Sequence, residues 1–181
     1  MADKPEAKND SPVIKCESVY KIFGSNAKKL LESSQGQVDA KTFQEAGCIV
    51  GVNKASFEVH RGEMLVVMGL SGSGKSTLLR CISRLTDATS GKIFIDGEDL
   101  LAMNSKQLIE LRRNKMGMVF QSFALLPHKT VLENIAFPLL MKKTGTNESI
   151  NKAMEMVELV GLKGRENYFP RELSGGQQQR V

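Results

Sequence analysis

The chain carries Gly69-Leu70-Ser71-Gly72-Ser73-Gly74-Lys75-Ser76-Thr77, which fits the pattern G-x-x-x-x-G-K-[ST] of a phosphate-binding P-loop. Residues 64–68, just before it, are apolar at every position, which is typical of a parallel strand covered on both faces. Residues 77–85, just after it, favour a helix with apolar residues along one side. A strand, a glycine-rich loop and a helix in this order predict an α/β fold of the P-loop class.

The P-loop residues suit a nucleotide polyphosphate. Backbone N–H groups can surround this dense anion only where side chains are out of the way, and Gly69, Gly72 and Gly74 provide that freedom. The helix that starts near Lys75 directs its positive end at the phosphates, and the Lys75 ammonium adds a cation for the β- and γ-phosphates. The Ser76 hydroxyl is the expected Mg²⁺ ligand. We therefore assign all nine residues to ATP binding. A glycine-rich turn without a ligand would not explain the flanking strand and helix.

A second glycine-rich stretch, Leu173-Ser174-Gly175-Gly176-Gln177, is called the LSGGQ segment below. A serine hydroxyl and bare amides at the start of a helix form a second anion site. The alternative is a glycine turn that only caps a helix. Together with a P-loop upstream, the segment favours the anion site.

The composition narrows the function classes. A chain of 181 residues with a net charge of +5 fits one domain, and its positive residues form short clusters typical of solvated surface. We therefore expect no nucleic-acid partner. The three cysteines are far apart and lack CxxC spacing, which argues against a disulfide framework or a zinc site. Residues 1–12 are predicted to be a disordered lead-in, and no apolar run is long enough to span a bilayer.

The remaining elements follow from apolar periodicity and turn signals. We expect Gly161 to follow directly on the last helix, because glycine suits that position. The further expected strands are residues 13–23, 52–59, 92–95 and 116–120. The further expected helices are residues 27–32, 105–113, 130–140 and 148–160.

From residue 14 to residue 181 the chain resembles the nucleotide-binding subunit of ATP-binding-cassette (ABC) transporters. The resemblance implies a nucleotide-binding domain over residues 13–181, with an N-terminal antiparallel β subdomain, a parallel core sheet and an α-helical subdomain. In that family the P-loop of one subunit and the LSGGQ segment of another enclose one ATP. Ser174, Gly175, Gly176 and Gln177 would then act on the nucleotide of a second copy, which implies a homodimer.

The resemblance also suggests roles for residues outside the two glycine-rich segments. Phe23 matches an aromatic residue that stacks on adenine, although it could instead be a core aromatic. Gln121 matches a glutamine that reaches Mg²⁺ and the attacking water, so Lys75 and Gln121 are the expected catalytic residues; Gln121 could also be a surface glutamine. The loop that begins at Ser122 and ends at His128 corresponds to the surface that docks on the transmembrane permease subunits.

A finer resemblance is to the ATPase subunits of glycine betaine/proline (quaternary-amine) importers. It rests on a long insert, residues 25–51, and on the amino-acid sequence of residues 68–77 and 120–128. It implies import of a quaternary amine, indirect partnership with a substrate-binding protein, and a peripheral position at the cytoplasmic face of the plasma membrane.

The family pattern continues beyond the LSGGQ segment with a strand ending in Asp (Walker B), a Glu that polarises water, and a switch His. The sequence up to Val181 lacks these residues, so we expect an incomplete domain. On its own the chain should bind Mg-ATP weakly or not at all and should not hydrolyse it, because no other carboxylate is placed to serve as the base.

Three other functions are alternatives to an ABC transporter subunit. A GTPase would carry N-K-x-D, but the candidate Asn151-Lys152-Ala153-Met154 lacks the Asp; a small-molecule kinase is a related alternative. A non-transport ABC protein of DNA repair or translation would usually carry large insertions or a second cassette. The chain could also be only an ATP-binding module.

Overall fold

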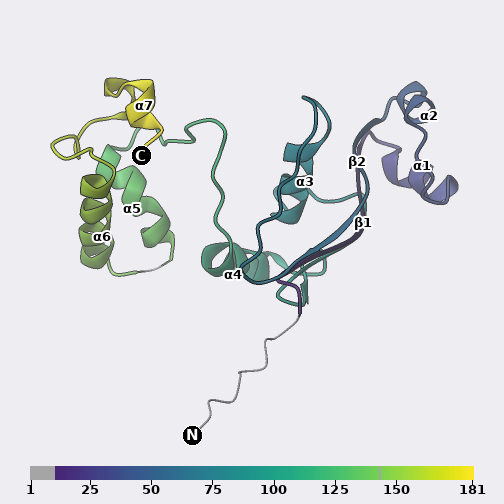
Figure 1. Cartoon of the computed structure of the whole chain (residues 1–181), viewed down its shortest axis with the longest axis horizontal. Helices are drawn as coiled ribbons and strands as arrows, with labels where there is room; N and C mark the ends of the chain where they lie inside the picture. Colours follow the sequence, from purple (N-terminus) through teal and green to yellow (C-terminus); the bar gives the residue numbers. More distant parts are fainter. Residues whose placement is uncertain (1–10, 143) are drawn as a thin grey trace, which may run out of the picture. The chain divides into compact units, whose positions relative to one another are not determined.

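The computed structural model describes residues 11–142 and 144–181 (Figure 1). The predicted lead-in lies outside the described residues except for Ser11 and Pro12. The chain divides into two units, residues 1–108 and 109–181, which are taken separately below. The first unit and the start of the second contain β1 (Ile14–Phe23), α1 (Ala27–Ser33), α2 (Ala40–Glu45), β2 (Ile49–Val59), α3 (Lys75–Ile82), β3 (Ser90–Ile95), β4 (Glu98–Asp99) and α4 (Ser105–Lys115). The rest of the second unit contains α5 (Val131–Met141), α6 (Thr146–Leu159), a 3₁₀ turn (Pro170–Glu172) and α7 (Gly175–Gln178).

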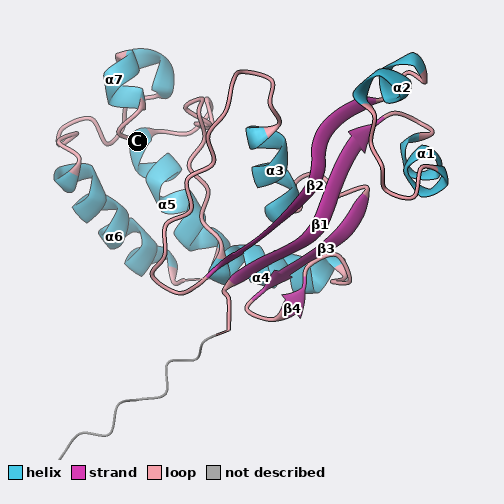
Figure 2. Cartoon of the chain, turned by 45° about the vertical axis from the view of Figure 1, so that its right-hand side comes forward, coloured by secondary structure: helices cyan, strands magenta, loops and turns pink. Residues whose placement is uncertain are grey.

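The first unit is built on an antiparallel sheet with the strand order β2-β1-β3-β4. The three longer strands confirm the predicted strands, although β2 begins three residues earlier than expected. Helix α3 packs against β1 and β2 and buries Leu78 and Cys81 (Figure 2). The antiparallel β subdomain and the helix after the P-loop are therefore both present, and the helix is held by its apolar side.

The insert folds into two helices that share a small core with β1. Figure 2 shows α1 and α2 at the end of the β1–β2 pair. Tyr20 and Ile22 of the sheet pack with Leu31 of α1 and Phe43 of α2, and Cys48 completes the cluster. The sequence predicted α1 but not α2, which is six residues long and buries a single side chain. Tertiary packing on Phe43 and a capping bond from the amide of Thr42 to the Asp39 carboxylate, 2.9 Å, stabilise it.

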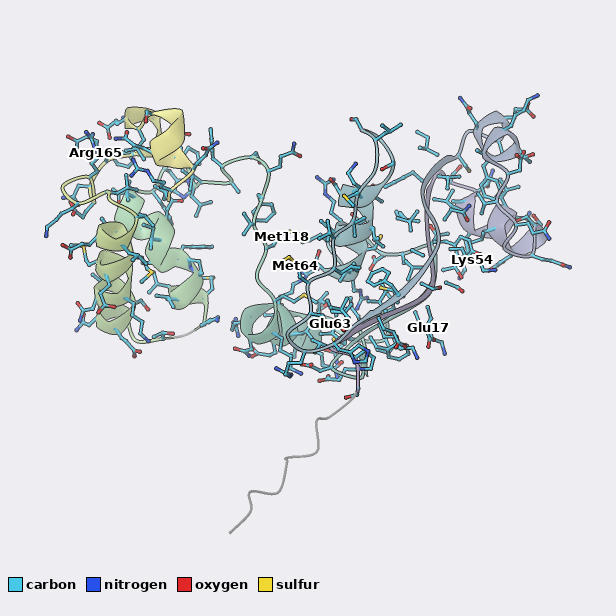
Figure 3. All side chains as sticks on the ribbon, viewed as in Figure 1. Glu17, Lys54, Glu63, Met64, Met118 and Arg165 are labelled. Carbon is cyan, nitrogen blue, oxygen red and sulfur yellow. The ribbon has the colours of Figure 1, made fainter. Side chains whose placement is uncertain are left out.

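The parallel core sheet that the sequence predicted is not formed by the described residues. Residues 64–68 and 116–120 are both outside helices and strands, and Figure 3 labels one residue of each segment, Met64 and Met118. The side chains of residues 64–68 are between 39% and 88% exposed, and Val119 is 99% exposed. A strand exists only through hydrogen bonds to a neighbour, and among the described residues neither segment is part of a paired strand. The two strand predictions were therefore wrong for this structure.

The second unit is centred on the pair α5 and α6, which contact each other along their length. Its core contains Val131, Val157, Leu162 and Leu173, so the residue that opens the LSGGQ segment is anchored in it. The helices predicted over residues 130–140 and 148–160 are confirmed within two residues as α5 and α6. Gly161 follows α6 with a φ of 67°, the left-handed conformation expected after a helix. Among the described residues, none of the helices has the length and apolar character that crossing a bilayer requires.

Phe43→Ala should destabilise the first unit by roughly 3 kcal/mol, because it removes a side chain that is 1% exposed and leaves a cavity in the insert core. Hydrogen exchange of the β1 amides as a function of urea measures the change. Phe137→Ala is the matched control, since that residue is 36% exposed and lies on α5 of the second unit, so its removal should leave the protection of the β1 amides unchanged. Equal effects of the two substitutions would contradict the insert core.

The first turn of α5 should give a pH-dependent stability. The Thr130 amide donates to Glu133 Oε2 at 2.7 Å, and this bond holds the pKa of Glu133 below its ordinary value of 4.5, with smaller effects from Lys129 and His128. Since the folded pKa is the lower one, the stabilisation is complete above pH 4.5 and is lost as the pH falls through the folded pKa. Protection of the α5 amides should fall in that range. Glu133→Gln should remove this component, and an unchanged profile in that variant would refute the assignment.

Candidate functional site

The P-loop wraps the N-terminus of α3. Gly74 is the N-cap of the helix in the left-handed conformation, with a φ of 90°, and Gly72 has a φ of 79°. A Cβ atom on Gly74 would lie 1.9 Å from the carbonyl oxygen of Gly51 on β2, so only glycine fits there. A Cβ on Gly72 would meet nothing within 4 Å. Gly74 is therefore needed for close packing against β2, whereas Gly72 lies at an open part of the loop.

The Lys75 side chain folds back over the loop. Its Nζ donates to the carbonyl oxygens of Gly69 at 2.8 Å and Leu70 at 2.7 Å, and more weakly to Ser73 Oγ at 3.4 Å. The ammonium is thus held at the loop by acceptors that a phosphate oxygen can replace. A flexible four-carbon stem allows that exchange without backbone movement.

The residues after Lys75 offer oxygen donors. Ser76 is exposed in the first turn of α3, and Thr77 is half-buried with its methyl group towards Gly51. A hydroxyl oxygen is a hard donor of the kind that Mg²⁺ shares with substrate phosphates. The positive helix end, the left-handed glycines, an ammonium group and this hydroxyl together suit a polyphosphate with Mg²⁺.

A cavity of about 230 Å³ joins the P-loop to the end of β1, lined by Phe23, Ile49–Gly51, Gly72 and Gly74–Thr77. A second cavity of about 410 Å³ lies between the loop and β2. Phe23 is 43% exposed, and Lys21 Nζ lies 4.9 Å from the centre of its ring. The position of Phe23 at a cavity wall does not fit a core aromatic, whereas its stacking on adenine stays a prediction.

The LSGGQ segment forms the start of α7. The Ser174 Oγ accepts from the Gln177 amide at 3.3 Å, and the Gln177 side chain accepts from the Ser174 amide at 2.9 Å. This reciprocal capping box fixes the backbone of Gly175 and Gly176 at the helix start, where the helix itself offers their amides no acceptor.

Two side chains that sequence reasoning missed hold α7 in place. The side-chain Nε2 of Gln178 donates to the carbonyls of Pro170 at 3.0 Å and Leu173 at 3.1 Å. Arg180 Nη1 donates to the carbonyl of Val160 at 3.0 Å, at the C-terminus of α6. Gln178 and Arg180 come shortly after the LSGGQ segment in the sequence, but their role in holding α7 becomes visible only from the carbonyl groups that they bind.

Gln121 and the loop of residues 122–128 are exposed or half-buried and lie outside helices and strands. Asn134 on α5, also missed from sequence, pins the end of this loop: its Oδ1 accepts from the Leu126 amide at 2.8 Å and its Nδ2 donates to the Leu126 carbonyl at 3.2 Å. Gln121 and the LSGGQ segment belong to the second unit and the P-loop to the first, so a shared site stays a prediction.

Comparison with known proteins decides the family. Residues 52–181 match the family described as ABC transporter. The chain belongs to the ABC transporter family. The described antiparallel sheet and P-loop helix agree with ABC cassettes of known structure: the ATP-binding cassette MJ0796, in a dimeric post-hydrolysis state bound to ADP and Pi, aligns with a TM-score of 0.73 and 32% identity over 92% of this chain and 66% of that one.

Curated relatives within the ABC transporter family are more similar in sequence. The trimethylamine N-oxide transport system ATP-binding protein TmoW of Pelagibacter ubique is 84% identical over 94% of this chain and 50% of its own length. The glycine betaine transport ATP-binding protein OpuAA of Bacillus subtilis is 48% identical over 96% and 42%, respectively. The glycine betaine/proline betaine protein ProV of Escherichia coli is 42% identical over 100% and 43%. The chain thus spans about half the length of the curated relatives it matches.

Gly74→Ala should disrupt the P-loop much more than Gly72→Ala. Both positions have φ near 80–90° and share the same backbone strain, but only the methyl group at position 74 collides with the Gly51 carbonyl. Hydrogen exchange of the α3 amides should show loss of protection in Gly74→Ala and a smaller loss, of about 1 kcal/mol, in Gly72→Ala. Equal losses would mean that the β2 contact is unimportant.

Proposed function

We propose that this chain is the ATP-binding part of an importer for a small quaternary amine or amine oxide. The observation that carries the proposal is the P-loop on α3, where Lys75, the helix N-terminus and Ser76 converge. ATP binding and hydrolysis would be coupled to solute import through other subunits. The names of the relatives, trimethylamine N-oxide and glycine betaine transport proteins, support this substrate class.

Each predicted site residue has a task in this proposal. The P-loop amides and Lys75 bind the β- and γ-phosphates, while Ser76 and Gln121 would hold Mg²⁺. When bound, Mg²⁺ neutralises charge on the phosphate oxygens. Gln121 would also orient the attacking water, and Phe23 would stack on adenine. These roles require Gln121 to approach the P-loop of the other unit.

Assembly follows the same scheme. The LSGGQ segment of a second copy would complete the ATP site, and the dimeric form of the similar cassette supports this arrangement. Residues 122–128, pinned by Asn134, would dock on transmembrane permease subunits at the cytoplasmic face of the membrane. A substrate-binding protein would deliver the amine. No described feature favours a GTPase, a kinase or a DNA-repair protein over this scheme.

Lys75→Ala in the full-length protein, assembled with its permease, should lower ATP turnover by about a hundredfold or more, because it removes the ammonium at the β- and γ-phosphates. Phosphate release by the reconstituted transporter measures it. Lys92→Ala, which removes an exposed side chain of β3, is the matched control and should keep normal turnover. Turnover of Lys75→Ala within a few-fold of wild type would refute the proposal. Stimulation by trimethylamine N-oxide or glycine betaine, added with the binding protein, tests the substrate class.

A further inference from the structure

The β1–β2 pair is irregular at Gly51. Lys21 pairs with Val52 and the next residue, Ile22, pairs with Val50, so Gly51 is an extra residue on β2 without a partner on β1. This is the arrangement of a β-bulge, which redirects the chain locally. We propose that Gly51 is a positioning residue for the nucleotide base: the bulge and the missing side chain leave the space in which the Phe23 ring lies beside the P-loop helix. The inference rests on the proposed function and extends it.

Neighbouring atoms leave little room for a side chain at position 51. A Cβ at this position would lie 2.9 Å from Phe23 Cε2, 3.0 Å from Thr77 Cγ2 and 3.4 Å from the Lys21 carbonyl. The contact with the Phe23 ring is shorter than real Cβ atoms show, and the contact with Thr77 is tight, so a side chain at position 51 must first of all displace the ring. The Gly51 carbonyl meanwhile occupies the position of a side chain on Gly74. One residue therefore contacts both the phosphate loop and the aromatic ring.

The backbone of Phe23 cannot easily move away from such a clash. On one side, Ile22 pairs with Val50 and Phe23 pairs with Ile49. On the other side, Thr89 Oγ1 accepts from the Ile22 amide at 2.9 Å and donates to the Ile22 carbonyl at 3.1 Å. Because the backbone is fixed on both sides, a methyl group on residue 51 would act mainly on the exposed Phe23 side chain.

The position of the Phe23 ring indicates which part of a nucleotide it would contact. Phe23 lines the same cavity of about 230 Å³ as Gly72, Gly74 and Ser76. A nucleotide with its phosphates in the P-loop extends from the loop towards this cavity, and an exposed ring suits stacking on a base. A methyl group on residue 51 would therefore lower the affinity for the base through the ring, while the backbone carbonyl that packs against Gly74 stays in place and the affinity for the phosphates changes little.

The test compares ATP with inorganic tripolyphosphate, which has the phosphates but no base. Equilibrium titrations use the full-length protein as wild type, Gly51→Ala, Phe23→Ala and the double variant. Each single variant should bind ATP about fivefold more weakly, the size expected for a lost aromatic contact. Tripolyphosphate affinity should change less than about twofold. The double variant should bind ATP no more weakly than Phe23→Ala alone, because the added methyl acts through the ring.

Gly145→Ala is the matched control, since its added methyl meets nothing within 4 Å and its φ is −53°. It should bind both ligands as wild type does. Thermal unfolding provides a second measurement: any stability that Gly51→Ala loses should be partly restored in the double variant, where the clashing ring is gone. This comparison remains decisive if Gly51→Ala alone folds poorly.

Three results would overturn the inference: unchanged ATP affinity in Gly51→Ala, an equal loss for tripolyphosphate, or additive losses in the double variant. The first would make the bulge irrelevant to the base, and the others would mean that residue 51 acts on the P-loop itself. A wild-type protein that binds neither ATP nor tripolyphosphate would instead refute the proposed function. The two failures are therefore distinguishable.

Discussion

The close approach of two glycines, Gly51 on β2 and Gly74 at the start of α3, is the constraint on which the first unit depends. The Gly51 carbonyl stands where any side chain on residue 74 would be, so the P-loop end of α3 is fixed against the sheet. Burial of Leu78 and Cys81 holds the rest of the helix, and a buried leucine side chain contributes roughly 2 kcal/mol. The P-loop is therefore positioned by the antiparallel sheet, while residues 64–68 just before it are exposed.

Local signals in the sequence predicted the elements whose stability is local. The P-loop glycines, the helix after them and Gly161 all act within one turn of their own position. The apolar runs at residues 64–68 and 116–120 do not form the predicted strands, because an apolar run becomes a strand only when another strand pairs with it. A pattern of five residues contains no information about that partner.

The features missed from sequence depend on distant partners. Helix α2 is held by Phe43 packing on Tyr20 and Ile22, the bulge at Gly51 becomes visible only from its register with β1, and Arg180 caps a helix that ends about twenty residues earlier. Glycine, asparagine and arginine occur in most loops, so their residue type alone did not mark them. The candidate site was predictable where chemistry fixes the residue type, as at Lys75, and not where packing does.

The bonds of Lys75 indicate how the loop is prepared for an anion. Its ammonium already lies at the P-loop, held by two carbonyl oxygens at 2.7–2.8 Å, so little side-chain freedom remains to be lost on binding. A phosphate oxygen carries more negative charge than a carbonyl oxygen, so it attracts the Lys75 ammonium more strongly than the two neutral acceptors do. Exchange of acceptors therefore favours the bound state although the number of hydrogen bonds stays the same. The glycine contact at β2 keeps the backbone still during that exchange, which links the packing of the sheet to the affinity of the loop.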